Sequence, residues 1–255
     1  MKVSAEGQKF LQISRDLLDR LEREQARNID KAADLIANAI AQDRLIHLLG
    51  AGGHTWMPVM EFFYRAGGLA CVNPLFDLGI TVYNKAWHGM LLERLPGYGK
   101  SIIDYYSHFF KSGDVIVITA NIPFMMVTVE AALECKKRGL KVISIGSRDW
   151  QKKAPKDLPP RHPSGQSLVE IADIFIDDYN PYGDANIKIE GCAQPVGSTS
   201  NIADCYIIQR LVMEVVKKLI AKGVEPPIYR SGNIPGGDEF NKKLLGKYIP
   251  RVKWL

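Results

Sequence analysis

The chain has 255 residues, of which 46% are hydrophobic and 24% are charged, an ordinary composition for a soluble globular protein with one large α/β domain. The net charge is +5 and the basic residues are spread along the chain, so no nucleic-acid surface is indicated. The four cysteines lack metal-ligand or disulfide spacing. Since no apolar signal core or span of about 20 apolar residues is present, we expect a cytoplasmic protein that has no membrane contact, metal ion or cofactor.

Residues 1–43 are predicted to form an N-terminal helical arm. Hydrophobic residues recur at spacings of three and four, in the sets Phe10, Ile13, Leu17, Leu21 and Ile29, Ala33, Ile36, Ile40. This periodicity is typical of one long or two shorter amphipathic helices. The apolar stripe either contacts a second copy of the chain or packs on the chain's own sheet. Residues 44–255 are expected to form one α/β domain.

The segment Leu45–Thr55, LIHLLGAGGHT, is the centre of the predicted domain. A short apolar run comes first, three glycines follow at Gly50, Gly52 and Gly53, and a helical pattern starts at Pro58. A buried strand, a glycine turn and a helix can direct backbone N–H groups at a bound anion. The alternative is a tight turn that binds nothing.

Two nucleotide-binding motifs are excluded at this glycine turn. A dinucleotide fingerprint needs a third glycine where the chain has Thr55, and an acidic residue after the second strand, which we expect to end at Asn73 and Pro74. A phosphate-binding Walker loop needs Gly-Lys-Ser/Thr, which does not follow.

The rest of the domain alternates strand and helix patterns. We predict strands at residues 70–73, 115–119, 142–145 and 174–176, and helices at 125–138, with Pro123 in its first turn, and at about 198–222. A long loop covers residues 147–163, and the tail after residue 225 is expected to be extended. Strand–helix–strand crossovers imply parallel strands. The predicted fold is therefore a three-layer α/β/α sandwich with a mostly parallel sheet, whose ligand loops gather at the carboxyl ends of the strands.

Several segments resemble sugar isomerase (SIS) domains. Residues 50–68, GAGGHTWMPVMEFFYRAGG, resemble the first ligand loop and helix of these domains. The segments KKRGLKVISIGS, RHPSGQSLVEIADIFID, GDANIKIEG and VGSTSNIAD resemble a branch of sugar isomerase domain-containing, phosphoheptose isomerase-like proteins. The resemblance extends over about residues 8 to 241. It implies a helix-covered parallel sheet, a dimer or tetramer, and a site for a sugar-phosphate-related ligand shared between subunits.

The resemblance also suggests site residues. The first loop matches at Gly50, Gly52, Gly53, His54 and Thr55, and Ser147 ends another matching segment. Glu61 lies near the position of a catalytic glutamate, His162 lies in an Arg-His-x-Ser-Gly motif, and Ser198, Thr199 and Ser200 match a hydroxyl cluster at the start of the last long helix. Each has a structural alternative: Glu61 can pair with Arg65 at i+4, His162 can cap loop backbone, and the hydroxyl cluster can cap a helix. Glu190 is a second carboxylate candidate in a strand-like setting.

The second ligand loop departs from the family pattern. Most SIS domains carry Ser-x-Ser-Gly at this place, and those serines hold phosphate, whereas this chain has Ala120-Asn121-Ile122-Pro123-Phe124. Only Asn121 matches the branch. Two hydroxyl donors and one backbone N–H are missing, so we expect weak phosphate binding at this loop, with the anion held by the first loop and residues 198–200.

The resemblance implies an aldose–ketose isomerase that acts on a sugar phosphate or related acidic sugar through an enediol. Glu61 would then move the proton between carbons, and His162 would assist ring opening or hydroxyl proton transfer. A sugar-phosphate sensor without turnover and an amino-sugar-phosphate lyase or etherase are the alternatives.

Overall fold

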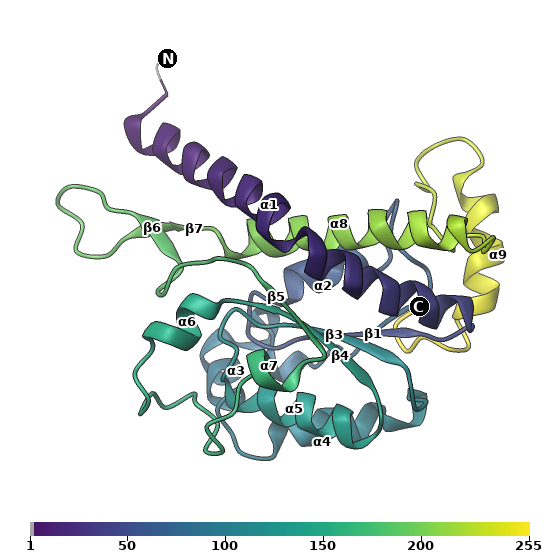
Figure 1. The fold of residues 1–255 in the computed structure, drawn as a ribbon, viewed down its shortest axis with the longest axis horizontal. Helices are drawn as coiled ribbons and strands as arrows, with labels where there is room; N and C mark the ends of the chain where they lie inside the picture. Colours follow the sequence, from purple (N-terminus) through teal and green to yellow (C-terminus); the bar gives the residue numbers. More distant parts are fainter. Residues whose placement is uncertain (1–2) are drawn as a thin grey trace.

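A five-stranded parallel sheet crosses the centre of the protein (Figure 1). The computed structural model describes residues 3–255. The strand order is β2-β1-β3-β4-β5, with the strands β1 (Ile46–Gly50), β2 (Val72–Pro74), β3 (Val115–Thr119), β4 (Lys141–Gly146) and β5 (Ile174–Asp177). The order reverses direction at β1 and β3, so the loops after these two strands flank the position where open α/β sheets bind ligands.

The central strands are buried on both faces because their side chains are almost all apolar. All five residues of β1 and of β3 are buried, as is usual for a parallel sheet covered by helices on both sides. The one polar side chain of β1, His47, is enclosed between Asp114 and Asn73, each at 3.2 Å. Burial lowers the pKa of His47. Because both ring nitrogens have a hydrogen-bond partner in the core, we assign His47 a structural role.

Helices cover both faces of the sheet (Figure 1). One layer contains α1 (Ala5–Ala41), α2 (Trp56–Phe62) and α8 (Ser200–Ala221), and the opposite layer contains α4 (Tyr98–Tyr106), α5 (Met126–Lys137) and α7 (Leu168–Ile171). The remaining elements are α3 (Ala86–Leu92), α6 (Arg148–Lys153), α9 (Gly237–Tyr248) and an antiparallel hairpin of β6 (Ala185–Ile187) and β7 (Val196–Ser198). The predicted three-layer α/β/α sandwich is confirmed.

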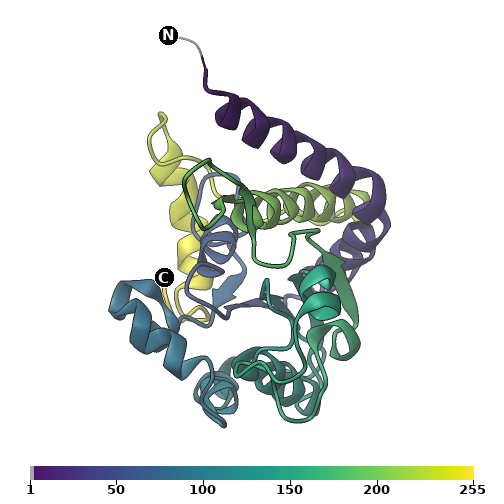
Figure 2. The ribbon, with the colours of Figure 1, turned by 90° about the vertical axis from the view of Figure 1, so that its left-hand side faces the viewer.

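The N-terminal arm is a single helix. Its C-terminal part lies along α8 and buries Leu21, Ile29 and Ile36, so packing within the chain accounts for much of the apolar stripe. Its first turns extend beyond the body in both ribbon views (Figures 1 and 2). There Phe10 packs against Gly197 of the β6–β7 hairpin, and half of the Leu11 surface is exposed.

Three local predictions were wrong. Pro123 precedes α5, which begins at Met126, because the Leu168 N–H bonds to the Pro123 carbonyl and holds this segment as a turn. The loop after Ser147 contains the short helix α6, and the tail contains α9. Among the helices of residues 3–255, none combines the length and apolar character that crossing a bilayer requires.

Candidate functional site

The loop from Gly50 to Thr55 is a tight turn between β1 and α2. Thr55 donates from its backbone N–H and from Oγ1 to the Gly52 carbonyl, at 3.0 and 2.8 Å. A Cβ on Gly50 would lie 2.7 Å from the Thr55 carbonyl oxygen, and Gly52 has φ +120°. Glycine is therefore required at both positions by the turn itself, whether or not a ligand binds there. His54 is exposed at the tip.

Glu93, which follows α3, lies against this loop. It is only 8% exposed, and its carboxylate faces the backbone N–H of Gly53. Burial raises the pKa of Glu93 to about 7, although the nearby backbone N–H of Gly53 works in the opposite direction. The Glu93 carbonyl also accepts from the Val127 N–H in α5 at 3.2 Å. A carboxyl group with this pKa can both take and give a proton near neutral pH.

The N-terminus of α8 also has a carboxylate partner from its own chain. Asp184 accepts hydrogen bonds from the backbone N–H groups of Thr199 and Ser200, at 3.2 and 3.1 Å, and from Ser200 Oγ at 2.8 Å. Thr199 Oγ1 donates to Asn180 Oδ1 at 2.8 Å. Ser198 lies outside the helix, at the exposed end of β7. The helix thus begins at Ser200, within the predicted N-terminal segment 198–201, and the N–H groups of Thr199 and Ser200 are already bonded.

Two further acids are completely buried beside this helix end. Asp178 follows β5, and Asp204 lies in the second turn of α8; both are 0% exposed. Burial raises the pKa of Asp178 to about 7 and that of Asp204 well above its usual range, with the neighbouring Asp178 adding to the effect. We conclude that the pair retains a proton at neutral pH, because two adjacent buried carboxylates cannot both be charged cheaply.

The second loop and the end of β4 are tightly joined. The Ser147 N–H donates to the Asn121 carbonyl at 3.2 Å, and Ser147 Oγ donates to the Asn180 carbonyl at 2.6 Å while it caps α6. Asn121 Oδ1 is buried without a hydrogen-bond partner among the described residues. Of the predicted polar groups here, the Asn121 amide oxygen is thus the one left to accept a ligand hydroxyl.

Glu61 points from α2 toward α8. It forms a salt bridge with Arg65 and accepts from Gln209 Nε2 at 2.9 Å, and its side chain is one-third exposed. This is the helix-surface arrangement that we considered as the structural alternative. The other carboxylate candidate, Glu190, lies in the exposed turn between β6 and β7.

His162 lies in a different place, at a cavity of about 630 Å³ formed by the loop after α6. Its Nδ1 accepts from the Ser164 N–H at 3.2 Å and contacts Ser164 Oγ at 2.7 Å. The cavity is lined by Gln151, Lys152, Ala154, Lys156, Asp157, Leu158, Arg161, His162, Pro163 and Gly165. The structure thus separates His162, Glu61 and the first loop onto three different elements.

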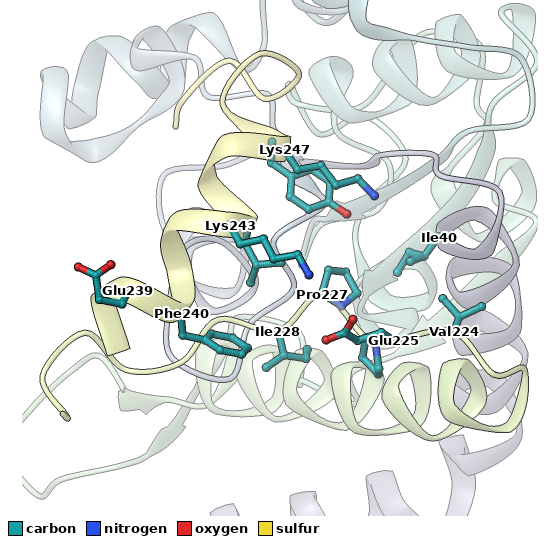
Figure 3. Close-up of a pocket in the computed structure, with 12 residues that line it drawn as sticks. Ile40, Val224, Glu225, Pro227, Ile228, Glu239, Phe240, Lys243 and Lys247 are labelled. Carbon is teal, nitrogen blue, oxygen red and sulfur yellow. The ribbon is translucent and has the colours of Figure 1, made fainter. Parts of the chain in front are cut away.

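A second cavity, of about 550 Å³, lies between α9, the end of α1 and residues 224–228 (Figure 3). Glu225 and Lys243 point into it over apolar walls that include Phe240 and Ile40. Ile228 is paired with Leu69, just before β2, so this cavity is at the amino end of the sheet. Ligands of open α/β sheets bind at the other end. No group of three or more potential metal ligands within residues 3–255 is arranged to hold a metal ion.

A family model described as the SIS domain matches residues 9–147, which is more than half of the chain. The chain belongs to the SIS domain family. The UPF0309 protein of Thermoanaerobacter pseudethanolicus is 37% identical to it, over 93% of this chain and 95% of its own length. The UPF0309 protein of Caldanaerobacter subterraneus subsp. tengcongensis is 34% identical, with the same coverage.

Solved structures support the SIS fold assignment. The phosphoheptose isomerase of Neisseria gonorrhoeae has a TM-score of 0.53 at 14% identity, over 81% of this chain and 95% of its own. The phosphoheptose isomerase of Francisella tularensis also has a TM-score of 0.53, at 11% identity, over 85% of this chain and 100% of its own. These similarities establish the shared fold.

Sequence reasoning missed Glu93 and Asp184. Glu93 follows a short amphipathic helix in an irregular region, and nothing in the local pattern shows that its side chain reaches the glycine loop. Asp184 has φ +62° and follows Gly183, a turn signal that could have indicated a carboxylate held at a fixed angle. The contact of each depends on tertiary packing.

Proposed function

We propose that this SIS protein binds a sugar phosphate or related acidic sugar and interconverts its aldose and ketose forms through an enediol. Family membership supports the ligand class. The observation that carries the reaction is the buried Glu93 carboxyl group against the first ligand loop, with its pKa raised to about 7. Isomerisation requires one group that removes a proton from one carbon and returns it to the neighbouring carbon, and a base with this pKa suits that role.

The groups around the strand ends suit the hydroxyls of a sugar. Glu93, Asp184 and the Asn121 amide oxygen all accept hydrogen bonds, and sugar hydroxyls donate them. The first-loop residues and Ser198–Ser200 remain proposed ligand contacts in this arrangement. Their main role would be to shape the surface around those acceptors. Glu61 and His162 remain alternative candidates for proton transfer, and mutation can compare them with Glu93.

The test is turnover of a panel of aldose and ketose phosphates by the variants Glu93→Gln, Glu61→Gln and His162→Gln. Glutamine preserves the shape of Glu93 and removes the base, so we expect Glu93→Gln to lose about 10²–10⁴-fold in kcat, with ligand affinity retained. The matched control for all three is Glu6→Gln, which makes the same change at an exposed position of α1. Wild-type turnover by Glu93→Gln, together with loss in either other variant, would move the catalytic role to that residue.

A sensor without turnover is the second candidate, supported by the altered second loop. Pro123 and Phe124 are buried there, and the hydroxyl donors of the usual pattern are replaced. Binding of sugar phosphates by the wild-type protein with no isomerisation, lyase or etherase product would favour this function.

We also propose a cytoplasmic homo-oligomer. Tyr83 and Trp87 follow Val82, which lies against Gly53, and these large apolar side chains are 72% and 73% exposed. Exposed apolar surface often marks an interface. Light scattering at micromolar concentration should give a mass of at least two chains; a single-chain mass would contradict this.

A further inference from the structure

Helix α6 and the loop after it line a cavity that has more cationic than acidic side chains. Lys152, Lys156 and Arg161 line it, against one acid, Asp157. Within residues 3–255, these three cations take part in no salt bridge, whereas their neighbours Lys153 and Arg148 pair with Asp149 and Asp177. The cavity therefore has an excess of positive charge and attracts anions.

Arg161 is held in a fixed orientation. Its guanidinium group stacks on the Phe124 ring at 3.7 Å, and Nη2 donates to the carbonyls of Ala154 and Pro155, at 3.4 and 3.3 Å. Arg161 Nε is buried and has no hydrogen-bond partner among the described residues. A guanidinium group that is pre-positioned and still has an unused donor suits the planar, multidentate recognition of a phosphate or carboxylate.

A second unpartnered group indicates a ligand that is more than a bare anion. Gln151 also lines the cavity, and its Oε1 is buried without a partner in the described part of the chain. An amide oxygen is a hydrogen-bond acceptor, so its partner must be a donor such as a hydroxyl group. Leaving this oxygen buried without a partner costs free energy. The cavity thus offers cations to an acidic group and, beside them, an acceptor to a hydroxyl group. This combination suits a polyhydroxylated acid.

The cavity wall is joined to the second ligand loop and to α5. The His162 N–H donates to the Phe124 carbonyl at 2.9 Å, and the Met126 N–H donates to the Pro160 carbonyl at 2.8 Å. On α5 the next residue, Val127, donates to the Glu93 carbonyl. Glu93 and the cationic cavity thus flank the same first turn of α5.

We infer that this cavity holds the acidic group, most simply a phosphate, of the sugar ligand, and that Arg161, Lys152 and Lys156 replace the serines missing from the second loop. This inference rests on the proposed function for the sugar part of the ligand. The acid would lie among cations on one side of α5, while the sugar carbons would extend toward the carboxylates at the strand ends.

The experiment measures binding of inorganic phosphate and of a panel of sugar phosphates, with their unphosphorylated sugars, by calorimetry. Lys152 and Lys156 are exposed, so Lys152→Ala/Lys156→Ala should fold normally. We expect it to bind phosphorylated ligands about 10-fold more weakly and unphosphorylated sugars unchanged. Lys9→Ala/Lys222→Ala is the matched control, because it removes the same charge from exposed positions elsewhere.

Arg161 is tested separately, since it also packs on Phe124. Arg161→Lys keeps the charge and should lose about 10-fold in affinity for phosphorylated ligands, because one charge-assisted fork is removed. Equal binding by wild type and both cavity variants, or no binding of any phosphorylated probe by wild type, would overturn the inference. Cavity-dependent binding without turnover would contradict isomerase activity alone, and turnover unaffected by these variants would contradict the cavity alone.

Discussion

Two regions near the carboxyl ends of the strands carry charged side chains of opposite sign. At the first loop the backbone N–H of Gly53 faces Glu93, and at the start of α8 the N–H groups of Thr199 and Ser200 are bonded to Asp184. In the cavity after α6, three cations take part in no salt bridge within residues 3–255. The first region therefore offers acceptors to a ligand, and the second offers positive charge.

This difference shows that the presence of donors in a sequence does not establish that they are available. The glycine loop and the Ser-Thr-Ser cluster have the residue types of an anion site, but Glu93 lies against Gly53, and Asp184 already accepts hydrogen bonds from Thr199 and Ser200. Lys152 lies near the end of α6, and Lys156 and Arg161 lie in the proline-rich loop after it. This segment resembles no standard anion motif, yet the three cations form no salt bridge within residues 3–255.

The pH dependence of stability gives the largest expected effect in the first region. The pKa of Glu93 rises from 4.5 to about 7 on folding, so the folded protein binds this proton more tightly than the unfolded chain. The stability that this group contributes is present below about pH 4.5 and is lost as the pH rises through about 7. At pH 8, we expect Glu93→Gln to be about 3 kcal/mol more stable than wild type.

Chemical denaturation from pH 5 to 8 checks this prediction. The buried pair Asp178 and Asp204 also makes stability fall as the pH rises, and it does so in both proteins. The difference between the two stability curves therefore isolates Glu93. Glu6→Gln, at an exposed position of α1, is the matched control and should follow wild type. Parallel stability curves for Glu93→Gln and wild type would show that Glu93 is ionised normally in the folded state.

Removing Asp184 should make the start of α8 able to bind an anion, as we propose for the cationic cavity. In Asp184→Gly, which tolerates the φ of +62° at this position, the N–H groups of Thr199 and Ser200 lose their acceptor, and the loss of such a helix-terminal hydrogen bond costs about 1 kcal/mol. The exposed helix end should then bind sulfate or phosphate, measured as a thermal shift that is absent from wild type. Asp19→Ala is the control, since it removes the same charge from an exposed position of α1, and it should neither lower stability nor change anion binding.

The fold was largely predictable from sequence because it depends on local signals. Val115–Thr119 is apolar and β-branched, its bounds as a strand were predicted to the residue, and the glycines and helical periodicities gave the alternation of strand and helix. Pro123 was misplaced, since a long-range bond from Leu168 decides its turn.

The site was less predictable because it depends on which distant side chains meet. Glu93 reaches Gly53 from about forty residues away in the chain, and Asp184 reaches α8 from the preceding hairpin. Glu61 matches the family pattern by position, while its contacts with Arg65 and Gln209 follow from the packing of α2 on α8. Residue type and spacing alone do not show which distant side chains meet or how one helix packs on another.

The most direct test is a crystal structure of the wild-type protein with a bound sugar phosphate identified by the binding panel. The division between an acceptor region and a cationic region predicts phosphorus density in the cavity, with Arg161 Nε bonded to the phosphate and Asp184 still bonded to Thr199 and Ser200. Phosphate on the backbone of residues 120–124, or at the start of α8 with Asp184 displaced, would contradict it.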